Sequence, residues 1–353
     1  MAQPQLTSMQ RVLTTLSHKE PDRVPLFLLL TMHGAKELGI SIKEYFSKAE
    51  YVVEGQLRML KKYRHDCLYN FYYAPLEVEA WGADVIFRED CPPNSGAPFI
   101  RKADQIKSLR PPSVKGSRVL QKTLESGRSL KAAVGDTVPI IGVVMSPFSL
   151  PVMQMGFDKY LELIFEEPAL FERLMEVNEA FCIEWANAQL ASGVTAIVYF
   201  DPVSSSSIIP RETFMRTGFN VARRVIPRIK GPVAMHFASE RCLPMADVLP
   251  DTGALAVGVS SMECLAALKK AYGGKMALVG NLNGIEMRTW NAAAATNAVR
   301  DAIAKGGAGG GFILSDNHGE IPWQVPEQTL LAISEAAHTL GRYPLAIADN
   351  NAA

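Results

Sequence analysis

The sequence has no excess of charge of either sign. Lys and Arg together number 36, as do Asp and Glu, so the formal net charge of the 353-residue chain is zero. No basic run with interleaved aromatic residues stands out, which argues against a nucleic-acid-binding surface. Charged residues make up 20% of the chain and apolar residues 48%, a composition typical of a folded protein. We therefore expect partners other than nucleic acid.

Long apolar runs and paired cysteines are also missing. No stretch of about 20 apolar residues occurs, so we expect no membrane-spanning helix. The first ten residues, MAQPQLTSMQ, lack the basic and apolar regions of a secretory signal. The five cysteines are scattered without CxxC spacing, which argues against a disulfide framework and favours a reducing compartment. We expect a cytoplasmic protein, and a homodimer is left open.

Short apolar runs recur along the chain and alternate with helical patterns. Helix-length connections between buried strands indicate parallel pairing, and eight such units predict an α/β fold of the (β/α)₈ TIM-barrel type. A doubly wound sheet is the competitor. However, the glycine-rich segment 306–311 precedes the last strand, so it cannot place phosphates at a helix start. The eight strand candidates are residues 24–30, 67–73, 139–145, 195–201, 232–237, 254–258, 276–282 and 311–316.

Two additions to the plain barrel are expected. Residues 7–20 have a helical pattern and predict an amino-terminal helical extension. Prolines and a glycine between two β-like pieces predict a small hairpin excursion near residues 84–101. Pro168 should divide the long helical pattern after residue 157 into two helices. We expect one domain over residues 1–353, with its core at about 9–343.

Polar side chains follow several of the predicted strands. In a barrel, the carboxyl ends of the strands share one mouth, and sites lie there. Alternate side chains of a strand point the same way, so Tyr199 and Asp201 should share a face. The candidates at the mouth are Met145, Tyr199, Asp201, His236, Glu240, Asn281, Asp316, His318 and Glu320.

His236 and His318, with a carboxylate, would suit a zinc ion. Neutral imidazole is a preferred zinc ligand, and a catalytic site leaves one position open. A histidine after a strand is nonetheless more often a hydrogen-bonded core or rim residue, and Asp201 before Pro202 could simply cap a loop. The residues alone leave both interpretations open. No P-loop, GxSxG or HExxH motif occurs.

Several segments, taken in order, resemble a known family. They are MQRVLTTLSHKEPDRVPL, GVVMSPFSLPVMQMGFDKYLELIFEEPALFERLM, MALVGNLNG and GGAGGGFILSDNHGEIPWQVPEQTLLAI. Their order and spacing resemble the uroporphyrinogen decarboxylase superfamily and, within it, the corrinoid-dependent methyltransferase branch typified by methylcobamide:coenzyme M methyltransferase. The likeness covers residues 9–343. It implies a (β/α)₈ barrel with its site at the carboxyl mouth.

The resemblance also implies a metal site, from which this chain departs. Coenzyme M methyltransferases hold zinc with a His-x-Cys pair after one strand and a Cys after the last strand. His236 matches the first ligand, whereas Ala238 stands in place of the first cysteine and His318 in place of the last. We expect a harder zinc site of His236, His318 and an oxygen ligand, Asp201 first and Glu240 next. Such a site suits the polarisation of a methoxy oxygen.

The function implied by the resemblance is methyl transfer. The methyl group would move between a small methylated substrate, such as a methoxylated compound in an O-demethylation, and cob(I)alamin carried by a corrinoid partner protein. Zinc would act as the Lewis acid, and Asp201 or Glu320 would complete or support its ligand shell as catalytic residues. The expected substrate contacts are Tyr199, Asp316, Asn281 and Met145.

Two alternatives keep the barrel. One is a metal-independent decarboxylase or lyase of the same superfamily, in which Asp201 or Asp316 stabilises a cationic intermediate. It fits less well, because the amino-terminal segment offers Arg11 alone to hold a substrate with several carboxylates. The other is a non-catalytic ligand- or corrinoid-binding module, against which the polar residues after the strands argue.

Overall fold

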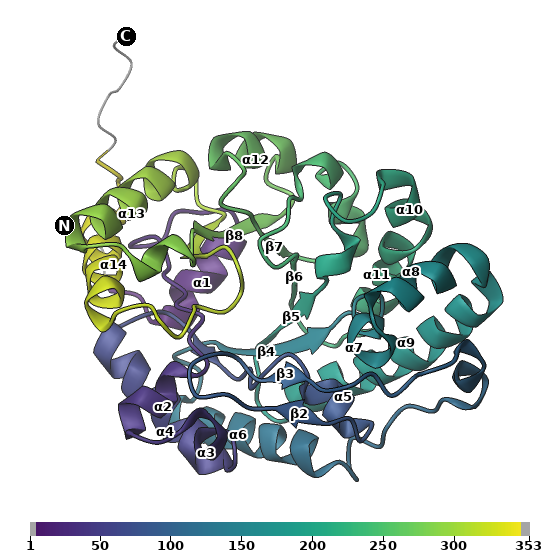
Figure 1. The fold of residues 1–353 in the computed structure, drawn as a ribbon. Helices are drawn as coiled ribbons and strands as arrows, with labels where there is room; N and C mark the ends of the chain where they lie inside the picture. Colours follow the sequence, from purple (N-terminus) through teal and green to yellow (C-terminus); the bar gives the residue numbers. More distant parts are fainter. Residues whose placement is uncertain (1–4, 347–353) are drawn as a thin grey trace.

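Seven parallel strands form one curved sheet in a computed structural model that describes residues 5–346 (Figure 1). Their order is β1-β4-β5-β6-β7-β8-β9, so each strand pairs with the next in the sequence. The first four residues of the segment searched for a secretory signal lie outside the described residues. The strands are β1 Leu68–Tyr69, β4 Ile140–Met145, β5 Ala196–Phe200, β6 Val233–His236, β7 Ala256–Gly258, β8 Ala277–Leu282 and β9 Phe312–Asp316.

Residues 24–30 take the eighth strand position and close the barrel. Leu26 forms a parallel bridge with Leu314 of β9. On its other side, the Leu26 carbonyl accepts the Asp66 N–H at 2.7 Å, just before β1. Pro25 has no N–H to donate, which limits regular pairing of this segment. All eight predicted strand segments therefore occupy barrel positions, and the predicted (β/α)₈ barrel is confirmed.

Helices surround the strands (Figure 1). Pro168 begins α9 directly after α8, so the predicted division is confirmed. Within residues 5–346 we find no helix with the length and apolar character that a bilayer crossing requires. The α-helices are α1 Ser8–Leu16, α2 His33–Leu38, α3 Ile42–Tyr45, α4 Ala49–Tyr63, α5 Leu76–Ala80, α6 Arg118–Val134, α7 Pro151–Met155, α8 Phe157–Glu166, α9 Pro168–Ala191, α10 Arg211–Arg216, α11 Gly218–Val225, α12 Leu265–Tyr272, α13 Ala292–Gly306 and α14 Glu327–Leu340. The 3₁₀ helices are η1 Ala103–Ser108, η2 Pro202–Ser204, η3 Ile226–Arg228, η4 Leu243–Met245, η5 Leu249–Thr252 and η6 Glu286–Arg288.

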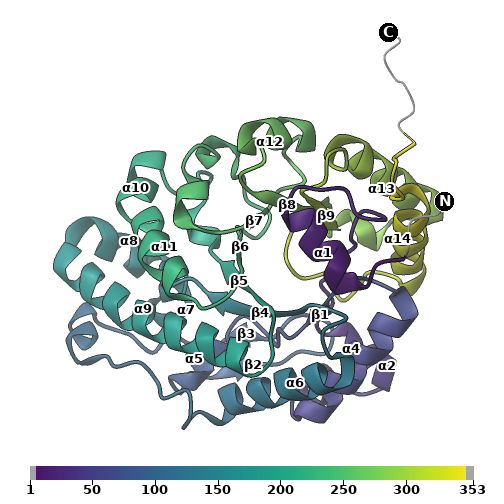
Figure 2. The same cartoon turned by 180° about the vertical axis from the view of Figure 1, so that it is seen from behind.

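The predicted amino-terminal extension is the helix α1, which crosses the amino-terminal ends of the strands. Thr7 and Gln10 form a capping box at its start. The helix ends at Leu16, earlier than predicted, and His18 takes a left-handed φ of 53°. The Met9 N–H donates to Thr137 ahead of β4. Both views place α1 beside β8, and Figure 2 also shows it beside β9 (Figures 1 and 2).

The predicted hairpin excursion is confirmed by a short antiparallel pair. Strand β2 (Val85–Ile86) pairs with β3 (Asn94–Ser95) as a separate two-stranded sheet. It lies near α5 and β4 in Figure 1.

The barrel has two apolar layers, because alternate strand residues point to opposite faces. One set packs against the surrounding helices and includes Ile197, Tyr199 and Met235. The other set fills the barrel interior and includes Val198 and Ala234. This alternation decides which polar residues can face the interior.

The Asp66 carboxylate joins three segments at the base of the barrel. Its Oδ1 accepts from Arg11 Nη1 at 2.7 Å on α1, and its Oδ2 accepts from Arg23 Nη1 at 2.6 Å. The Leu26 N–H also donates to Oδ2, at 2.9 Å. Burial raises the pKa of Asp66, but the charges of Arg23 and Arg11 outweigh it and hold the pKa below its usual range. The ionised carboxylate therefore ties α1 and residues 24–30 to the start of β1.

We expect Asp66→Asn to lower the free energy of unfolding by about 3–5 kcal/mol, because it leaves two buried guanidinium groups without their anion. Urea unfolding followed by circular dichroism measures this. Asp104→Asn removes a surface pair with Lys107 and should leave the urea midpoint unchanged. Equal midpoints for wild type and Asp66→Asn would contradict this role of Asp66.

Candidate active site

His236 ends β6 with its ring turned into the barrel interior. Ala234, two residues earlier, belongs to the interior layer, so His236 points the same way. The imidazole stacks on Phe200 of β5, with ring centroids 5.1 Å apart and planes 9° apart. Gly258 of β7 makes room for it, because a Cβ there would come within 2.2 Å of His236 Cδ2. The ring is therefore held in one orientation and is 3% exposed.

One hydrogen bond sets the tautomer of His236. Its Nδ1 accepts the Ala238 N–H at 3.0 Å, in a turn where Ala238 and Ser239 have φ of 49° and 75°. Burial, with a smaller contribution from nearby His318, lowers the pKa of His236 to about 3. The ring is neutral, and its single proton must lie on Nε2. Nε2 is buried and has no hydrogen-bond partner in the described structure.

The loop after β9 folds back over this ring. Asp316 Oδ2 accepts the N–H groups of His318 and Gly319, each at 2.8 Å. Gly319 has a φ of 87°, and a Cβ there would lie 2.6 Å from Phe200 and 3.2 Å from His236. Only glycine allows so close an approach. The turn at Asp316 therefore brings the loop against β5 and β6.

Two carboxyl groups lie close together in this loop. Burial raises the pKa of Asp316, and the two backbone hydrogen bonds oppose the rise. Burial also raises the pKa of Glu320 to about 7; the hydrogen bond from Thr31 opposes the rise, and nearby Asp316 adds to it. The Tyr69 hydroxyl donates to the Gly319 carbonyl at 2.8 Å and fixes the loop between them. Glu320 can therefore hold or release a proton near neutral pH.

The two histidine loops meet, as the sequence analysis anticipated. His318 Nδ1 lies 2.9 Å from Ser239 Oγ, so the turn after β6 contacts the loop after β9. His318 itself is exposed, whereas His236 is buried beneath Gly319.

Tyr199 and Asp201 share one face of β5, as expected, but that face is turned away from the interior. Tyr199 is fully buried in the layer between the strands and the helices. Asp201 Oδ1 accepts from the hydroxyls of Ser146 and Ser149. The expectation that these two residues line the mouth is therefore wrong. Alternation along a strand predicts that two residues share a face, but it does not predict whether that face points into the barrel or toward the helices.

The three other residues predicted at the mouth, Met145, Asn281 and Glu240, lie in different surroundings. Met145 ends β4 and packs near Phe200, beside the mouth. The Asn281 amide donates to the Ser260 and Glu263 carbonyls, at 2.8 and 3.1 Å, and so holds the loop after β7. Glu240 lies in the turn after β6, where its N–H donates to Phe237. A substrate contact from any of these three residues stays a prediction.

The expected zinc ligands do not come together in this arrangement. Among residues 5–346, no group of three or more His, Cys, Asp or Glu side chains could hold a metal ion. Asp201 faces away, and His236 already uses Nδ1 to accept a backbone N–H, so its Nε2 carries a proton rather than a free lone pair. The set of His236, His318 and Asp201 or Glu240 is thus not assembled, and no step below depends on zinc. The resemblance predicts a zinc site, whereas this placement of the side chains predicts that the two histidines do not share a metal ion.

Glu77 was missed by the sequence analysis. It lies in α5, 3% exposed, and its Oε1 accepts the Met145 N–H at 2.8 Å. Burial raises the pKa of Glu77 to about 8, and this hydrogen bond opposes the rise. The sequence did offer one sign of a buried carboxylate at this position, because Glu77 lies between the apolar residues Leu76 and Val78.

Comparisons with known proteins now define the family. The uroporphyrinogen decarboxylase (URO-D) family model matches residues 7–340. The chain belongs to the uroporphyrinogen decarboxylase family. It is 26% identical over 313 residues to the uroporphyrinogen decarboxylase of Methylococcus capsulatus, covering 86% of this chain and 87% of that protein. It is 23% identical to the enzyme of Legionella pneumophila strain Lens, covering 93% and 96%.

A solved structure shows the same fold. A methyltransferase from Methanosarcina mazei superposes with a TM-score of 0.82 at 18% identity, covering 95% of this chain and 99% of that one. A putative vitamin-B12-independent methionine synthase from Listeria monocytogenes superposes with a TM-score of 0.52 at 16% identity, covering 90% and 95%. Within the URO-D family, the barrel of this chain therefore has the architecture of the Methanosarcina protein over nearly its whole length.

We expect the purified chain, after zinc reconstitution and gel filtration, to hold well under one zinc ion per chain by elemental analysis. His236→Ala and His318→Ala should leave that value unchanged, as should His338→Ala, whose imidazole hydrogen-bonds within α14. A full zinc ion that is lost in the first two variants but kept in the third would place both site histidines on one metal.

Proposed function

We propose that this chain transfers a methyl group between a small methylated substrate, such as a methoxylated compound, and a corrinoid protein. Glu320 exchanges the proton at the heteroatom. The observation that carries the proposal is the pair of carboxyl groups after β9, a buried Asp316 and a half-buried Glu320 whose pKa is about 7. The shared fold of the methyltransferase from Methanosarcina mazei agrees with this activity.

The proton balance explains why such a carboxyl group is useful. When a CH₃–O bond breaks, a corrinoid acceptor would take the methyl group, and the bonding electron pair would stay on the oxygen. That oxygen must gain a proton to become a neutral hydroxyl group, and a carboxylic acid with a pKa near 7 can donate it. In the reverse direction, the Glu320 carboxylate removes the same proton. Thr31 holds one oxygen of Glu320 in place through its hydroxyl.

The flat faces beside Glu320 suit the body of an aromatic or other apolar substrate. Phe200 is partly exposed and stacks on His236, with Met145 nearby. Aromatic rings prefer such offset or parallel contacts. The imidazole of His318 lies exposed above them, where it could contact the polar end of a substrate.

A carboxy-lyase is the second candidate, favoured by the names of the curated relatives. Glu320 could then protonate the carbon that loses carbon dioxide. A substrate with several carboxylates needs cations, and Arg11 is not free to supply one. Arg11 is 3% exposed, and its guanidinium binds Asp22 and Asp66, each at 2.7 Å, in the segment at the base of the barrel.

We expect Glu320→Gln to slow methyl transfer to a corrinoid acceptor by about 10²- to 10⁴-fold, the usual value of a general acid. In the wild type, the demethylation rate should fall as the pH rises through about 7, because the protonated form of Glu320 is lost. The Gln variant should lack this fall. Glu335→Gln, at an exposed position on α14, serves as the control and should match the wild type. A retained pH profile in Glu320→Gln would contradict the assignment.

We also expect methoxylated aromatic compounds to methylate cob(I)alamin when the chain is present, as followed by its visible spectrum. Uroporphyrinogen offered to the same preparation should release no carbon dioxide above the uncatalysed rate. Decarboxylation without methyl transfer would favour the carboxy-lyase. Tight retention of a ligand with neither reaction would favour a binding module.

A further inference from the structure

The inner face of the barrel has unusually small side chains near its base. Barrel interiors are commonly filled by layers of bulky branched residues. Here Ala196, Ala234 and Ala256 occupy successive inward positions on β5, β6 and β7, and Gly258 follows on β7. Their missing volume leaves an apolar cavity of about 90 Å³.

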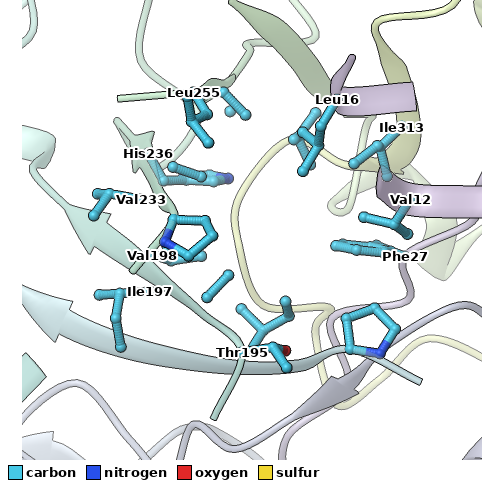
Figure 3. A pocket seen from close by; sticks show the side chains of 18 of the residues that line it. Val12, Leu16, Phe27, Thr195, Ile197, Val198, Val233, His236, Leu255 and Ile313 are labelled. Carbon is cyan, nitrogen blue, oxygen red and sulfur yellow. The ribbon is translucent and has the colours of Figure 1, made fainter. Parts of the chain in front are cut away.

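The cavity lies between α1 and the site at the mouth. Val12 and Leu16 of α1 form one wall, and Phe27 and Ile313 lie beside them (Figure 3). Leu255 marks its outer rim and is 48% exposed. An entry path from the base of the barrel therefore runs past apolar side chains, away from the carboxyl mouth.

Two polar side chains line this apolar space, and only one of them lacks a partner, because the Thr195 hydroxyl already bonds to the backbone of Ile140. The imidazole of His236 lines the cavity and extends into it (Figure 3). Because Nδ1 accepts the Ala238 N–H, the ring proton lies on Nε2, and this buried N–H has no partner in the described structure. A buried donor without an acceptor is costly and is usually satisfied by a ligand or water.

Water is a poor occupant of such a space. An ordered buried water needs two to four polar partners, whereas the cavity wall is almost entirely apolar. Empty apolar cavities instead take small apolar molecules; one of roughly 150 Å³ in another protein binds benzene or xenon. A cavity of about 90 Å³ suits a molecule with fewer non-hydrogen atoms than benzene.

We propose that this cavity is a second binding site, for a small apolar molecule with one hydrogen-bond acceptor that the Nε2–H of His236 holds. The site opens from the base of the barrel, shares His236 with the candidate active site, and does not depend on the proposed methyl transfer. An ether or a ketone has the required chemistry, since each combines an apolar body with a single accepting oxygen.

Binding can be tested on the full chain with xenon, cyclopentane and tetrahydrofuran. The last two are nearly equal in size, and only tetrahydrofuran accepts a hydrogen bond. We expect saturable shifts of methyl signals from Val198 and Ile313 by NMR with all three probes. Ala234→Leu should abolish these shifts by filling the cavity. Ala292→Leu, at the exposed start of α13, should keep them.

The role of His236 is read from the ratio of the two affinities. The ratio of the dissociation constants of cyclopentane and tetrahydrofuran should fall about fivefold in His236→Leu, because the donor is lost while the difference in solvation between the probes is unchanged. An unchanged ratio overturns the hydrogen bond to the ligand. The absence of saturable binding in the wild type overturns the site, as does binding that persists in folded Ala234→Leu. If Ala234→Leu fails to fold, Ala196→Val replaces it and should weaken all three probes.

Discussion

The buried carboxylate of Asp66 is the contact on which the closure of the barrel depends. Residues 24–30 are too irregular to pair as a full strand, and a single bridge joins them to β9. Asp66 compensates by accepting the Leu26 N–H and binding two guanidinium groups, so one side chain anchors the first strand position and α1 together. The ionic contact lies at the base of the barrel, where residues usually serve stability, and it leaves the mouth free for function.

The candidate active site is made by turns more than by strands. Asp316 uses one carboxylate oxygen to fold the loop after β9, and Gly319 allows that loop to reach the rings of Phe200 and His236. Thr31 then reaches Glu320 from the end of the first strand position. Glu320 therefore lies where the first and last strand positions of the barrel meet. The same pair of neighbouring segments closes the barrel at its base and holds the candidate acid at its mouth.

Much of the architecture could be read from the sequence, because apolar periodicity, Pro168 and the eight strand segments are local signals. The meeting of the loops that hold His236 and His318 also followed, since parallel strands share one carboxyl edge. The orientation of Tyr199 and Asp201 could not be predicted, because alternation shows that they share a face but not whether that face points inward or outward. The tautomer of His236 depends on one backbone N–H in a left-handed turn, and Thr31 and Glu320 are far apart in the chain. Such contacts exist only after folding.

The small residues inside the barrel have a mechanical consequence. Space that is empty in the folded state disappears on unfolding, so the unfolded chain occupies a smaller total volume with its water. Hydrostatic pressure therefore acts on this barrel through the alanine-lined interior rather than through the well-filled layer beneath the helices. The base of the barrel is its compressible part, and the helix α1 is the wall most directly placed to move inward when the volume is reduced.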